Sequence, residues 1–463
     1  MVLAAQFMAL LDTFIVNVAA PTIRGELGTS GAGLQLVVAG YTVAYAVLLI
    51  TGARLGGLFG HGRAHLAGLA LFTAASLACG LAAGTGQLIA FRLLQGAGAA
   101  VMIPQVLSLI QHHFTGRARA RALGAYAAVL AVGAAAGQVV GGVLVSADLF
   151  GMSWRPVFLV NVPVGIVLLV LGSRLLPREP RTAESRVRAR GRGLDLPGTV
   201  LLATAVTLLT VPLVLGHELG RSLWFWACLA GSAVVLAGFV AYEGRLAARG
   251  GAPLIAPRVL RIPGLARAAL RIALIMALNA GFLFAATLHL QGGLGHSALR
   301  TGLMFGSSAL TFGVVAMTWG RWPAALRKVL VPAGFLLVAL ATAAVGLLLR
   351  DGSDGGPVLH AVFAVWGVGL AIGFSPTLTE ALATVRPEDA ADASGVLVTV
   401  TQLGQLIGVA TFGTLYLERL DGAGADASAR ALAACAAALV ATAIAGAATG
   451  LGRRRSGEGP RAG

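Results

Sequence analysis

Two charged side chains stand inside long apolar runs of the sequence. Asp12 lies within the run 2–21, and Arg92 lies within the run 88–110. A charged group at the centre of a membrane span costs about 2.5–3.5 kcal/mol to insert, so such residues are rare and mark ion or proton pathways. Burial favours the neutral form of a carboxyl group and a nearby arginine favours the charged form, so a carboxyl group between both can bind and release a proton. We predict that Asp12 and Arg92 couple proton movement; the alternative is a permanent structural ion pair.

Other polar and aromatic side chains within apolar runs are weaker candidates. Glu380 is a possible second coupling carboxylate, or else an acid at a helix end that faces water. Uncharged polar residues in membrane helices either bond to neighbouring helices or line a cavity, and single aromatic residues either pack or form cavity walls. The substrate-cavity candidates are Asn17, Tyr41, Tyr45, Gln95, Gln105, Gln138, Asn279, Phe282, Trp366 and Gln402.

Several kinds of chemistry are excluded by residue type and spacing. The phosphate loop of many nucleotide hydrolases needs a lysine followed by serine or threonine, whereas the single lysine, Lys328, precedes Val329. Three scattered cysteines, Cys79, Cys228 and Cys435, give no metal or disulfide pattern. We therefore expect no enzyme activity, no metal and no cofactor. The net charge of +16 comes from arginines between apolar runs, which favours a membrane surface over nucleic acid.

Composition indicates a membrane protein. Of 463 residues, 57% are hydrophobic and 11% are charged, against about 25% charged residues in soluble chains. About 20 apolar residues cross the ~30 Å hydrocarbon core of a bilayer. The sequence holds fourteen such runs, at 2–21, 34–55, 64–83, 88–110, 122–145, 157–176, 198–216, 222–242, 267–290, 299–318, 330–348, 358–380, 394–416 and 428–450.

The distribution of basic residues predicts the orientation of these spans. Loops on the side of the two termini hold 24 basic residues, and loops on the opposite side hold 7. Because positively charged loops stay in the cytoplasm, we expect both termini to be cytoplasmic. The predicted organisation is an N-terminal six-helix bundle (1–176), an arginine-rich linker (177–197), two additional helices (198–242), a second linker (243–266), a C-terminal six-helix bundle (267–450) and a basic tail (451–463).

Three segments carry a family resemblance. Residues 11–21 read LDTFIVNVAAP, residues 92–99 read RLLQGAGA, and residues 154–165 read WRPVFLVNVPVG. Together with 194–198, 253–255 and 394–395, they resemble, in order, the motifs of the fourteen-helix drug:proton antiporters of the major facilitator superfamily. The resemblance implies an all-α membrane fold in which the helices that carry Asp12 and Arg92 lie side by side.

Two motifs depart from the pattern of that family. The loop between the second and third helices contains Arg54, Gly57, Gly60 and Arg63, and the family usually has an aspartate where Gly57 stands. The resemblance implies that this loop latches the two bundles, so we expect a weakened latch. In the fifth helix the glycine–proline pair of the family is replaced by Gly137 and Gln138. A small-residue surface for close helix packing remains, formed by Gly133, Gly137 and Gly141.

These observations predict a secondary transporter in the inner membrane of a bacterium. It would export a lipophilic or amphipathic drug in exchange for protons, by alternating access around a cavity between the two bundles. We expect the proton gradient as the energy source, a monomer, and small molecules, protons and lipid as the partners. The alternatives are export of a natural product, siderophore or lipid made by the same cell, and a membrane sensor or scaffold that transports nothing.

Overall fold

The computed structural model describes residues 1–176, 194–220, 222–251, 253–255, 257–327, 329–383, 385, 390–420, 422 and 424–451. Most of the predicted arginine-rich linker and nearly all of the basic tail lie outside these residues. The described part is helical and contains no strand.

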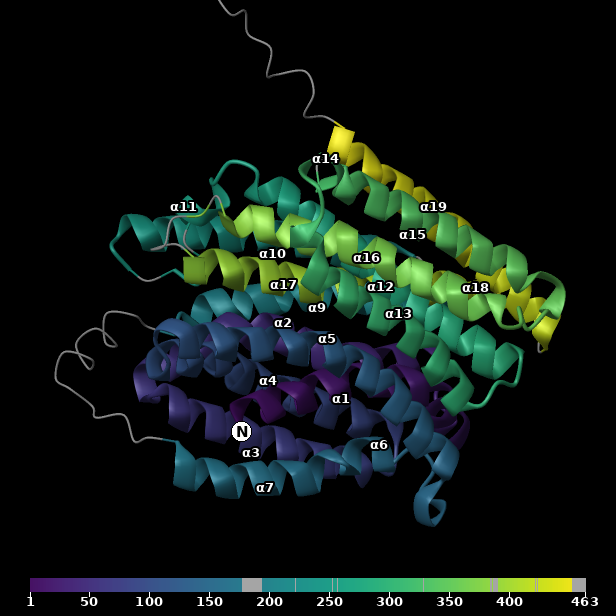
Figure 1. The fold of residues 1–463 in the computed structure, drawn as a ribbon, viewed down its shortest axis with the longest axis horizontal. Coiled ribbons are helices and arrows are strands. Elements are labelled where there is room, and N and C mark those ends of the chain that lie inside the picture. Colours follow the sequence, from purple (N-terminus) through teal and green to yellow (C-terminus); the bar gives the residue numbers. More distant parts are fainter. Residues whose placement is uncertain are drawn as a thin grey trace, which may run out of the picture.

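The N-terminal part and the two helices after it form a first series of elements. These are α1 Val2–Leu27, α2 Gly31–Phe59, α3 His61–Gly80, α4 Thr85–His113, α5 Gly116–Ala147, η1 Leu149–Gly151, α6 Pro156–Leu159, α7 Asn161–Leu175, α9 Leu196–Leu219 and α10 Leu223–Ala248 (Figure 1).

The C-terminal part forms the second series. These elements are α11 Pro257–Leu260, α12 Leu265–Thr287, η2 Leu288–Gly293, α13 Ala298–Thr318, η3 Trp319–Arg321, α14 Ala324–Arg327, α15 Leu330–Leu348, η4 Arg350–Gly352, α16 Val358–Ala383, α17 Ala390–Gly408, η6 Val409–Gly413, α18 Thr414–Glu418 and α19 Ala425–Leu451. Two of them, η2 and η6, are single π-helical turns that continue α12 and α17.

Twelve helical segments in the described residues are long and apolar enough to cross a membrane. α3 and α5 occupy the places of the third and fifth predicted spans but are not among the twelve. The polar start of α3, with His61, Arg63 and His65, explains its absence from the twelve. In α5 the apolar stretch found among the described residues, Ala136–Ala147, is shorter than a span. The all-helical membrane class is therefore confirmed, and the count of fourteen spans stays a prediction.

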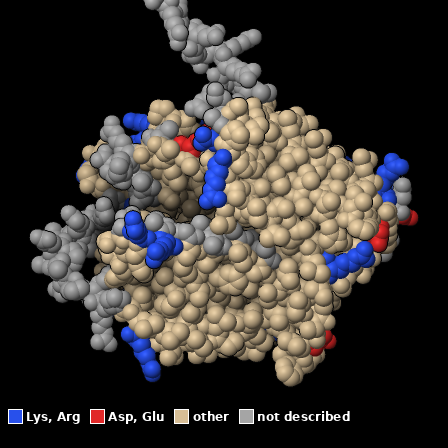
Figure 2. All heavy atoms as spheres, viewed as in Figure 1, with Lys and Arg blue, Asp and Glu red and all other residues tan. Residues whose placement is uncertain are grey.

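The outer surface fits a lipid environment. Leu340 and Leu347 are about two-thirds exposed, at 68% and 67%, and other large apolar side chains are exposed on α7 and α10. Figure 2 shows charged side chains mostly toward the two ends of the molecule, with a broad uncharged face between them. Many large exposed apolar side chains, on a face without charge, are typical of a surface in contact with lipid and not of a soluble monomer.

Helix ends follow from local sequence. Ser30 and Ser297 begin α2 and α13, and their hydroxyl groups accept hydrogen bonds from the N–H groups of Gly33 and Arg300, as N-cap residues do. Gly28 ends α1 in the left-handed conformation with φ 57°, which glycine adopts without steric cost.

Glycine permits the closest helix contact in the N-terminal part. α2 and α4 pack along each other, and a Cβ at Gly52 of α2 would overlap the carbonyl oxygen of Ala100 in α4. A Cβ at Gly96 of α4 would overlap the carbonyl oxygen of Tyr41 in the same way. Backbone contact of this kind is typical of membrane helices that pack through small residues, and it fixes α4 against the helices that carry the predicted site.

Candidate functional site

Asp12 and Arg92 are in direct contact inside the N-terminal part. Arg92 Nη1 donates to Asp12 Oδ2 at 2.6 Å, and the two side chains are 0% and 1% exposed. Asp12 lies on α1 and Arg92 on α4, so the pair joins two helices that are adjacent in the molecule. An ion pair removed from water in this way is stable only when the remaining hydrogen-bonding capacity of both groups is satisfied.

Neighbouring amides satisfy that capacity. The other oxygen of Asp12, Oδ1, accepts from Gln95 Nε2 at 2.7 Å and from Asn161 Nδ2 at 2.8 Å. Gln95 Oε1 in turn accepts from Arg92 Nη1 at 2.7 Å, and Gln95 Nε2 also donates to Ser76 Oγ at 2.7 Å. Each side chain that is hydrogen-bonded to the Asp12 carboxylate is therefore a donor, which is the arrangement that a carboxylate requires. Protonation of Asp12 would remove its charge and add an O–H group that faces only donors, so it must be accompanied by rearrangement of these side chains.

Aromatic side chains enclose the guanidinium group. Arg92 Cζ lies 4.7 Å from the centre of the Tyr41 ring and 5.7 Å from the centre of the Phe158 ring. The Phe158 ring packs edge-on against Trp154, which is fully buried. These rings exclude water, and they attract the positive charge of Arg92 through their electron-rich faces.

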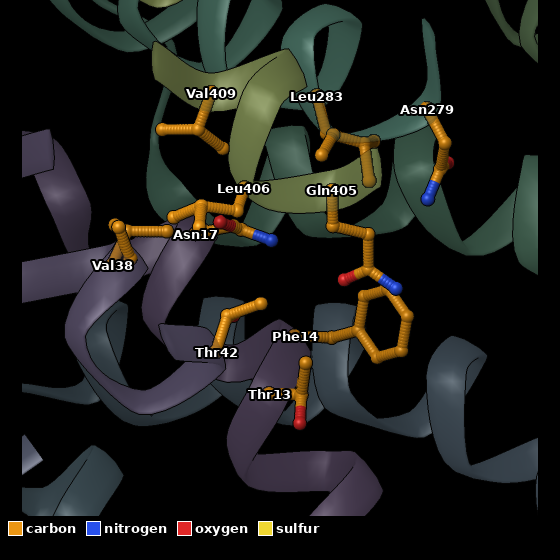
Figure 3. A pocket seen from close by; sticks show the side chains of 12 residues that line it. Thr13, Phe14, Asn17, Val38, Thr42, Asn279, Leu283, Gln405, Leu406 and Val409 are labelled. Atoms are coloured by element: carbon orange, nitrogen blue, oxygen red, sulfur yellow. The ribbon is translucent and has the colours of Figure 1, made fainter. Parts of the chain in front are cut away.

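A small cavity lies between the N-terminal and C-terminal parts (Figure 3). Its volume is about 20 Å³, which is room for about one water molecule. α1 and α2 form one wall, and α12 with α17 and η6 forms the other. The lining residues are Thr13, Phe14, Asn17, Val38, Ala39, Thr42, Asn279, Ala280, Leu283, Gln405, Leu406 and Val409. A drug-sized molecule needs a pocket of about 300–1,000 Å³, so these walls must separate before such a molecule can bind.

Tyr41 connects the ion pair to this cavity. Its ring lies over Arg92, and its hydroxyl group lies near the side chain of Thr13, which lines the cavity. Tyr41 is itself 1% exposed and does not line the cavity. The charged pair is thus inside the N-terminal part, one side chain away from the space between the two parts.

The predicted cavity residues divide into several groups. Asn17 and Asn279 line the cavity from opposite walls (Figure 3). Gln402 does not line it, but its Oε1 accepts a long hydrogen bond of 3.5 Å from Gln405 Nε2, and Gln405 does line it. Gln95 instead belongs to the network around Asp12.

The other polar candidates lie elsewhere. Gln105 donates to the carbonyl oxygen of Gly52 at 2.8 Å and its Oε1 lies 2.8 Å from His61 Nδ1, so it joins α4 to α2 and α3. Gln138 of α5 is 2% exposed and its Oε1 has no partner among the described residues. Tyr45 stacks on Tyr41 with ring centres 6.0 Å apart.

Phe282 and Trp366 belong to an aromatic cluster inside the C-terminal part. Their ring centres are 4.5 Å apart, and Phe363 packs against Phe282 at 5.5 Å and against Phe305 at 5.4 Å. All four rings are almost fully buried. In this form of the protein they pack α12, α13 and α16 together rather than forming walls of the cavity.

Glu380 is exposed near the C-terminal end of α16. It is not among the residues that line the cavity, and Asp12 has its own partners on other helices. No contact among the described residues links it to the pair.

The glycines of α5 face α1. A Cβ at Gly137 would lie 2.8 Å from the carbonyl oxygen of Leu11, and a Cβ at Gly141 would lie 2.9 Å from the Ile15 side chain. Gly133 makes the same kind of contact with Leu10, at 3.0 Å. The small-residue surface therefore packs against the helix that carries Asp12, and a different glycine, Gly142, contacts α13 at Ala298.

The predicted loop between the second and third helices is a single residue, Gly60, because Arg54 and Gly57 lie in α2 and Arg63 lies in α3. The last turns of α2 contact the segment before α11. Arg54 Nη2 donates to the carbonyl oxygen of Pro253. Gly60, with φ 94°, ends α2 and begins α3, whereas Arg63 is exposed. Gly57 is also exposed, and no described atom beyond its chain neighbours and its own helix lies within 4 Å of the position of a Cβ there.

These two glycine environments in α2 predict opposite effects of substitution. Gly57→Asp should leave the melting temperature of the purified protein nearly unchanged, because the side chain enters open space and the helix loses a glycine. Gly52→Ala should lower it by several degrees, because the Cβ overlaps the Ala100 carbonyl and overpacking costs about 1–3 kcal/mol. Thermal unfolding in one detergent measures both, and equal melting temperatures for the two variants would contradict the α2–α4 packing.

Some residues of the site carry no strong signal in the sequence. Ser76 and Thr13 are small hydroxyl residues in apolar helices, where most such residues bond to their own backbone. Asn161 is part of a recognised motif but is separated from Asp12 by 149 positions. Its place is set by the break after α6, since α7 begins at Asn161.

Comparison with known proteins identifies the family. Residues 2–409 match the model of the Major Facilitator Superfamily. The chain belongs to that superfamily. Its membership confirms that the protein is a multi-pass membrane transporter and not an enzyme, and the alternative of a sensor or scaffold that transports nothing is set aside.

Similar proteins include named antibiotic exporters. The chain is 40% identical over 426 residues to a probable actinorhodin transporter of Streptomyces coelicolor, covering 90% of this chain and 71% of that protein. It is 39% identical to the cephamycin export protein CmcT of Amycolatopsis lactamdurans, covering 93% and 86%. It is 32% identical to the multidrug resistance protein Stp of Mycobacterium tuberculosis, covering 88% and 73%. The resemblance to drug exporters of this superfamily is thereby confirmed.

Solved structures show the same fold. A bacterial homologue of the human lysosomal transporter Spinster, in an inward-facing and occupied conformation, superposes with a TM-score of 0.65 at 16% identity, covering 97% of this chain and 94% of that one. A POT family transporter in complex with 5-aminolevulinic acid gives a TM-score of 0.61 at 13% identity, covering 96% and 94%. At these identities the likeness extends to the fold alone.

Proposed function

We propose that this transporter exports a lipophilic or amphipathic small molecule, such as an antibiotic, in exchange for protons. The observation that carries the proposal is the buried Asp12–Arg92 pair, which lies one side chain away from a cavity between the two parts. A buried charge of this kind costs stability, and in membrane transporters such residues belong to proton and substrate pathways. Relatives named as exporters of actinorhodin and cephamycin support a cargo of that class.

The geometry supports a simple coupling scheme. When Asp12 is a carboxylate, it holds Arg92, Gln95 and Asn161 together from α4 and α7. A proton on Asp12 neutralises the carboxylate and removes one acceptor site, which loosens α1 against these helices. Because α1 also forms one wall of the cavity, the proton state of Asp12 biases whether that wall is closed. Such a coupling requires only that substrate and proton favour different conformations.

The proposal includes a topology. We infer that α3 and α5 cross the membrane together with the twelve apolar segments, which gives fourteen spans and two six-helix bundles. Both termini are cytoplasmic, since the loops on their side carry most of the arginines. The protein is a monomer in the inner membrane of a bacterium.

A proteoliposome assay tests the function. Purified protein is reconstituted, a pH gradient is imposed, and movement of actinorhodin or a cephamycin is followed with and without a protonophore. We expect accumulation against the substrate gradient that stops when the pH gradient is dissipated. Movement at the same rate without a pH gradient would remove proton exchange and leave only facilitated passage.

A growth panel distinguishes broad drug export from export of one natural product. The relatives include both kinds, since Stp is named a multidrug resistance protein and CmcT a cephamycin export protein. Cells that lack the transporter are compared with complemented cells on dyes, biocides and antibiotics. Sensitivity to many unrelated compounds supports broad export, whereas sensitivity to a single compound supports a dedicated exporter.

A further inference from the structure

Two carboxyl groups meet at one end of α9 and α10, far along the chain from Asp12. Asp195 is the N-cap residue of α9 and is half-buried, whereas Glu243 lies in α10 and is 3% exposed. A Cβ at Gly198 would touch both Asp195 Oδ2 and Glu243 Oε1, so these two oxygens border the same point. The carboxyl groups are therefore side by side.

Three of the four carboxyl oxygens have donors within the protein. Asp195 Oδ1 accepts from Gly198 N–H at 3.1 Å and from Tyr242 Oη–H at 2.8 Å. Asp195 Oδ2 accepts from Leu254 N–H at 3.0 Å, and Glu243 Oε2 accepts from Ile255 N–H at 2.9 Å. The fourth oxygen, Glu243 Oε1, is buried and has no donor among the described residues.

A proton would supply the missing hydrogen bond. Two adjacent carboxyl groups cannot both ionise without strong repulsion, so one of them retains its proton. Burial raises the pKa of Asp195, but hydrogen bonds from Glu243, from Tyr242 and from the N–H groups of Gly198 and Leu254 outweigh burial and hold that pKa below its usual value. Asp195 accepts three hydrogen bonds and Glu243 accepts one, so the charge is better stabilised on Asp195 and the proton is better placed on Glu243, where it can donate to Asp195.

We propose that Asp195 and Glu243 form a second proton-binding site, which holds one proton and fastens residues 253–255 to α9 and α10. No bond other than that to the proton is made or broken. The site is separate from Asp12 and does not depend on the proposed proton exchange there.

The fastened segment also contacts α2. Pro253 accepts from Arg54 of α2, and Thr199 of α9 lies 2.8 Å from Thr51 of α2, hydroxyl to hydroxyl. Loss of the shared proton would place two negative charges together and would weaken the hold of the carboxylates on Leu254 and Ile255. The site therefore connects proton concentration to the contact between α2, the two additional helices and the segment that leads to α12 (Figure 1).

The titratable and charged groups on the surrounding elements are Tyr242 and Arg245 on α10, Arg54 on α2 and Arg258 on α11. Donors on three of the four carboxyl oxygens favour a first negative charge, and repulsion between the two carboxyl groups opposes a second. We therefore expect one bound proton and not two.

Infrared difference spectroscopy of the full-length protein detects the proton directly. During an alkaline titration the C=O band of a protonated carboxyl group should decrease, and Glu243→Gln should remove that component. The matched control is Glu380→Gln, which changes an exposed glutamate at a helix end and should leave the component in place. Signal from Asp12 is common to all three proteins and cancels in the comparison.

Hydrogen exchange at Leu254 and Ile255 tests what the proton does. After correction for the intrinsic pH dependence of exchange, protection of these two amides should fall by about tenfold or more when the pair loses its proton. A tenfold change is what we expect if the pKa of the pair differs by about one unit between the state in which the segment is held and the state in which it is released. In Glu243→Gln the side-chain amide still donates to Asp195, so protection should no longer depend on pH.

Two results would overturn the site. One is a carboxyl band that is the same in the wild type and in Glu243→Gln. The other is protection of Leu254 and Ile255 that does not change with pH in the wild type. Neither readout involves transport, so failure of the site is distinguishable from failure of proton-coupled export. Asp195→Asn is a second variant: without a charged neighbour, Glu243 should lose its proton at lower pH.

Discussion

Changing Asp12 to asparagine should abolish transport driven by a pH gradient, with passive substrate binding retained. Coupling between two ligands of one protein corresponds to about 1–3 kcal/mol, or about a 5- to 150-fold change in affinity. In the wild type, substrate affinity should change with pH by a factor in that range, and in Asp12→Asn this dependence should disappear. Equilibrium binding at several pH values, together with uptake into proteoliposomes, measures both effects.

Asp12→Asn should also destabilise the protein, and this effect must be separated from coupling. Arg92 is 1% exposed, and breaking a buried ion pair by removal of one partner costs about 3–5 kcal/mol because a buried charge is left unpaired. The double variant Asp12→Asn with Arg92→Gln removes both charges and should regain most of the lost stability. It should still fail to couple transport to the pH gradient.

The double variant decides between the two interpretations of the pair. If Asp12 and Arg92 form only a structural ion pair, restoring stability restores gradient-driven transport, and the coupling role is refuted. Glu380→Gln is the control, since it removes a carboxylate that is exposed and lies outside the cavity lining. We expect this control to transport at the rate of the wild type.

Joining α5 to α13 with a disulfide bond should stop transport almost completely. Ser146 Oγ accepts from Leu299 N–H at 3.0 Å, so these two residues are neighbours and are chosen for a Ser146→Cys, Leu299→Cys variant. At the same end Gln291 Nε2 donates to the Val18 carbonyl oxygen at 2.9 Å, so the two parts are in contact there. Alternating access requires this contact to open in each cycle.

Oxidation and reduction of the same sample provide the comparison. Transport should fall to the background of empty liposomes after oxidation and return after treatment with a reductant. Each single cysteine variant should be insensitive to the oxidant, and the native Cys79 and Cys435 are buried. Full transport in a quantitatively cross-linked sample would show that the α5–α13 contact does not open.

Much of the architecture could be predicted from the sequence because membrane helices reveal themselves by length and apolarity. The limits of the predicted runs lie close to the helices that the structure describes, and twelve of these helices meet the criteria for a span. The structure departs from the predicted runs where the geometry of a helix changes locally. α6 and α7 meet at Val160, and the π turns η2 and η6 extend α12 and α17. Apolar content does not encode such local changes of helix geometry.

The pair of charges was easier to predict than the cavity. Asp12 and Arg92 are conspicuous because charge inside a span is costly, and the family resemblance implies that their helices lie side by side. An uncharged residue such as Gln105 can form its hydrogen bonds with neighbouring helices or with groups in a cavity, and here it bonds to Gly52 and His61. Glycine, alanine and leucine cover every side of these helices, so the sequence does not indicate which side of α4 Gln105 occupies. The roles of all these residues stay predictions.

Asp12 and its partners lie within the N-terminal part, whereas the cavity is lined among the described residues by amide, hydroxyl and apolar side chains, none of them charged. In the proposed mechanism, proton coupling and cargo selection therefore use different atoms. Substitutions at positions such as Asn17 or Asn279 could alter which compound is accepted while leaving the proposed proton-coupling pair, Asp12 and Arg92, intact. A lineage that acquires a new toxic metabolite would need only a few changes in that lining to dispose of it.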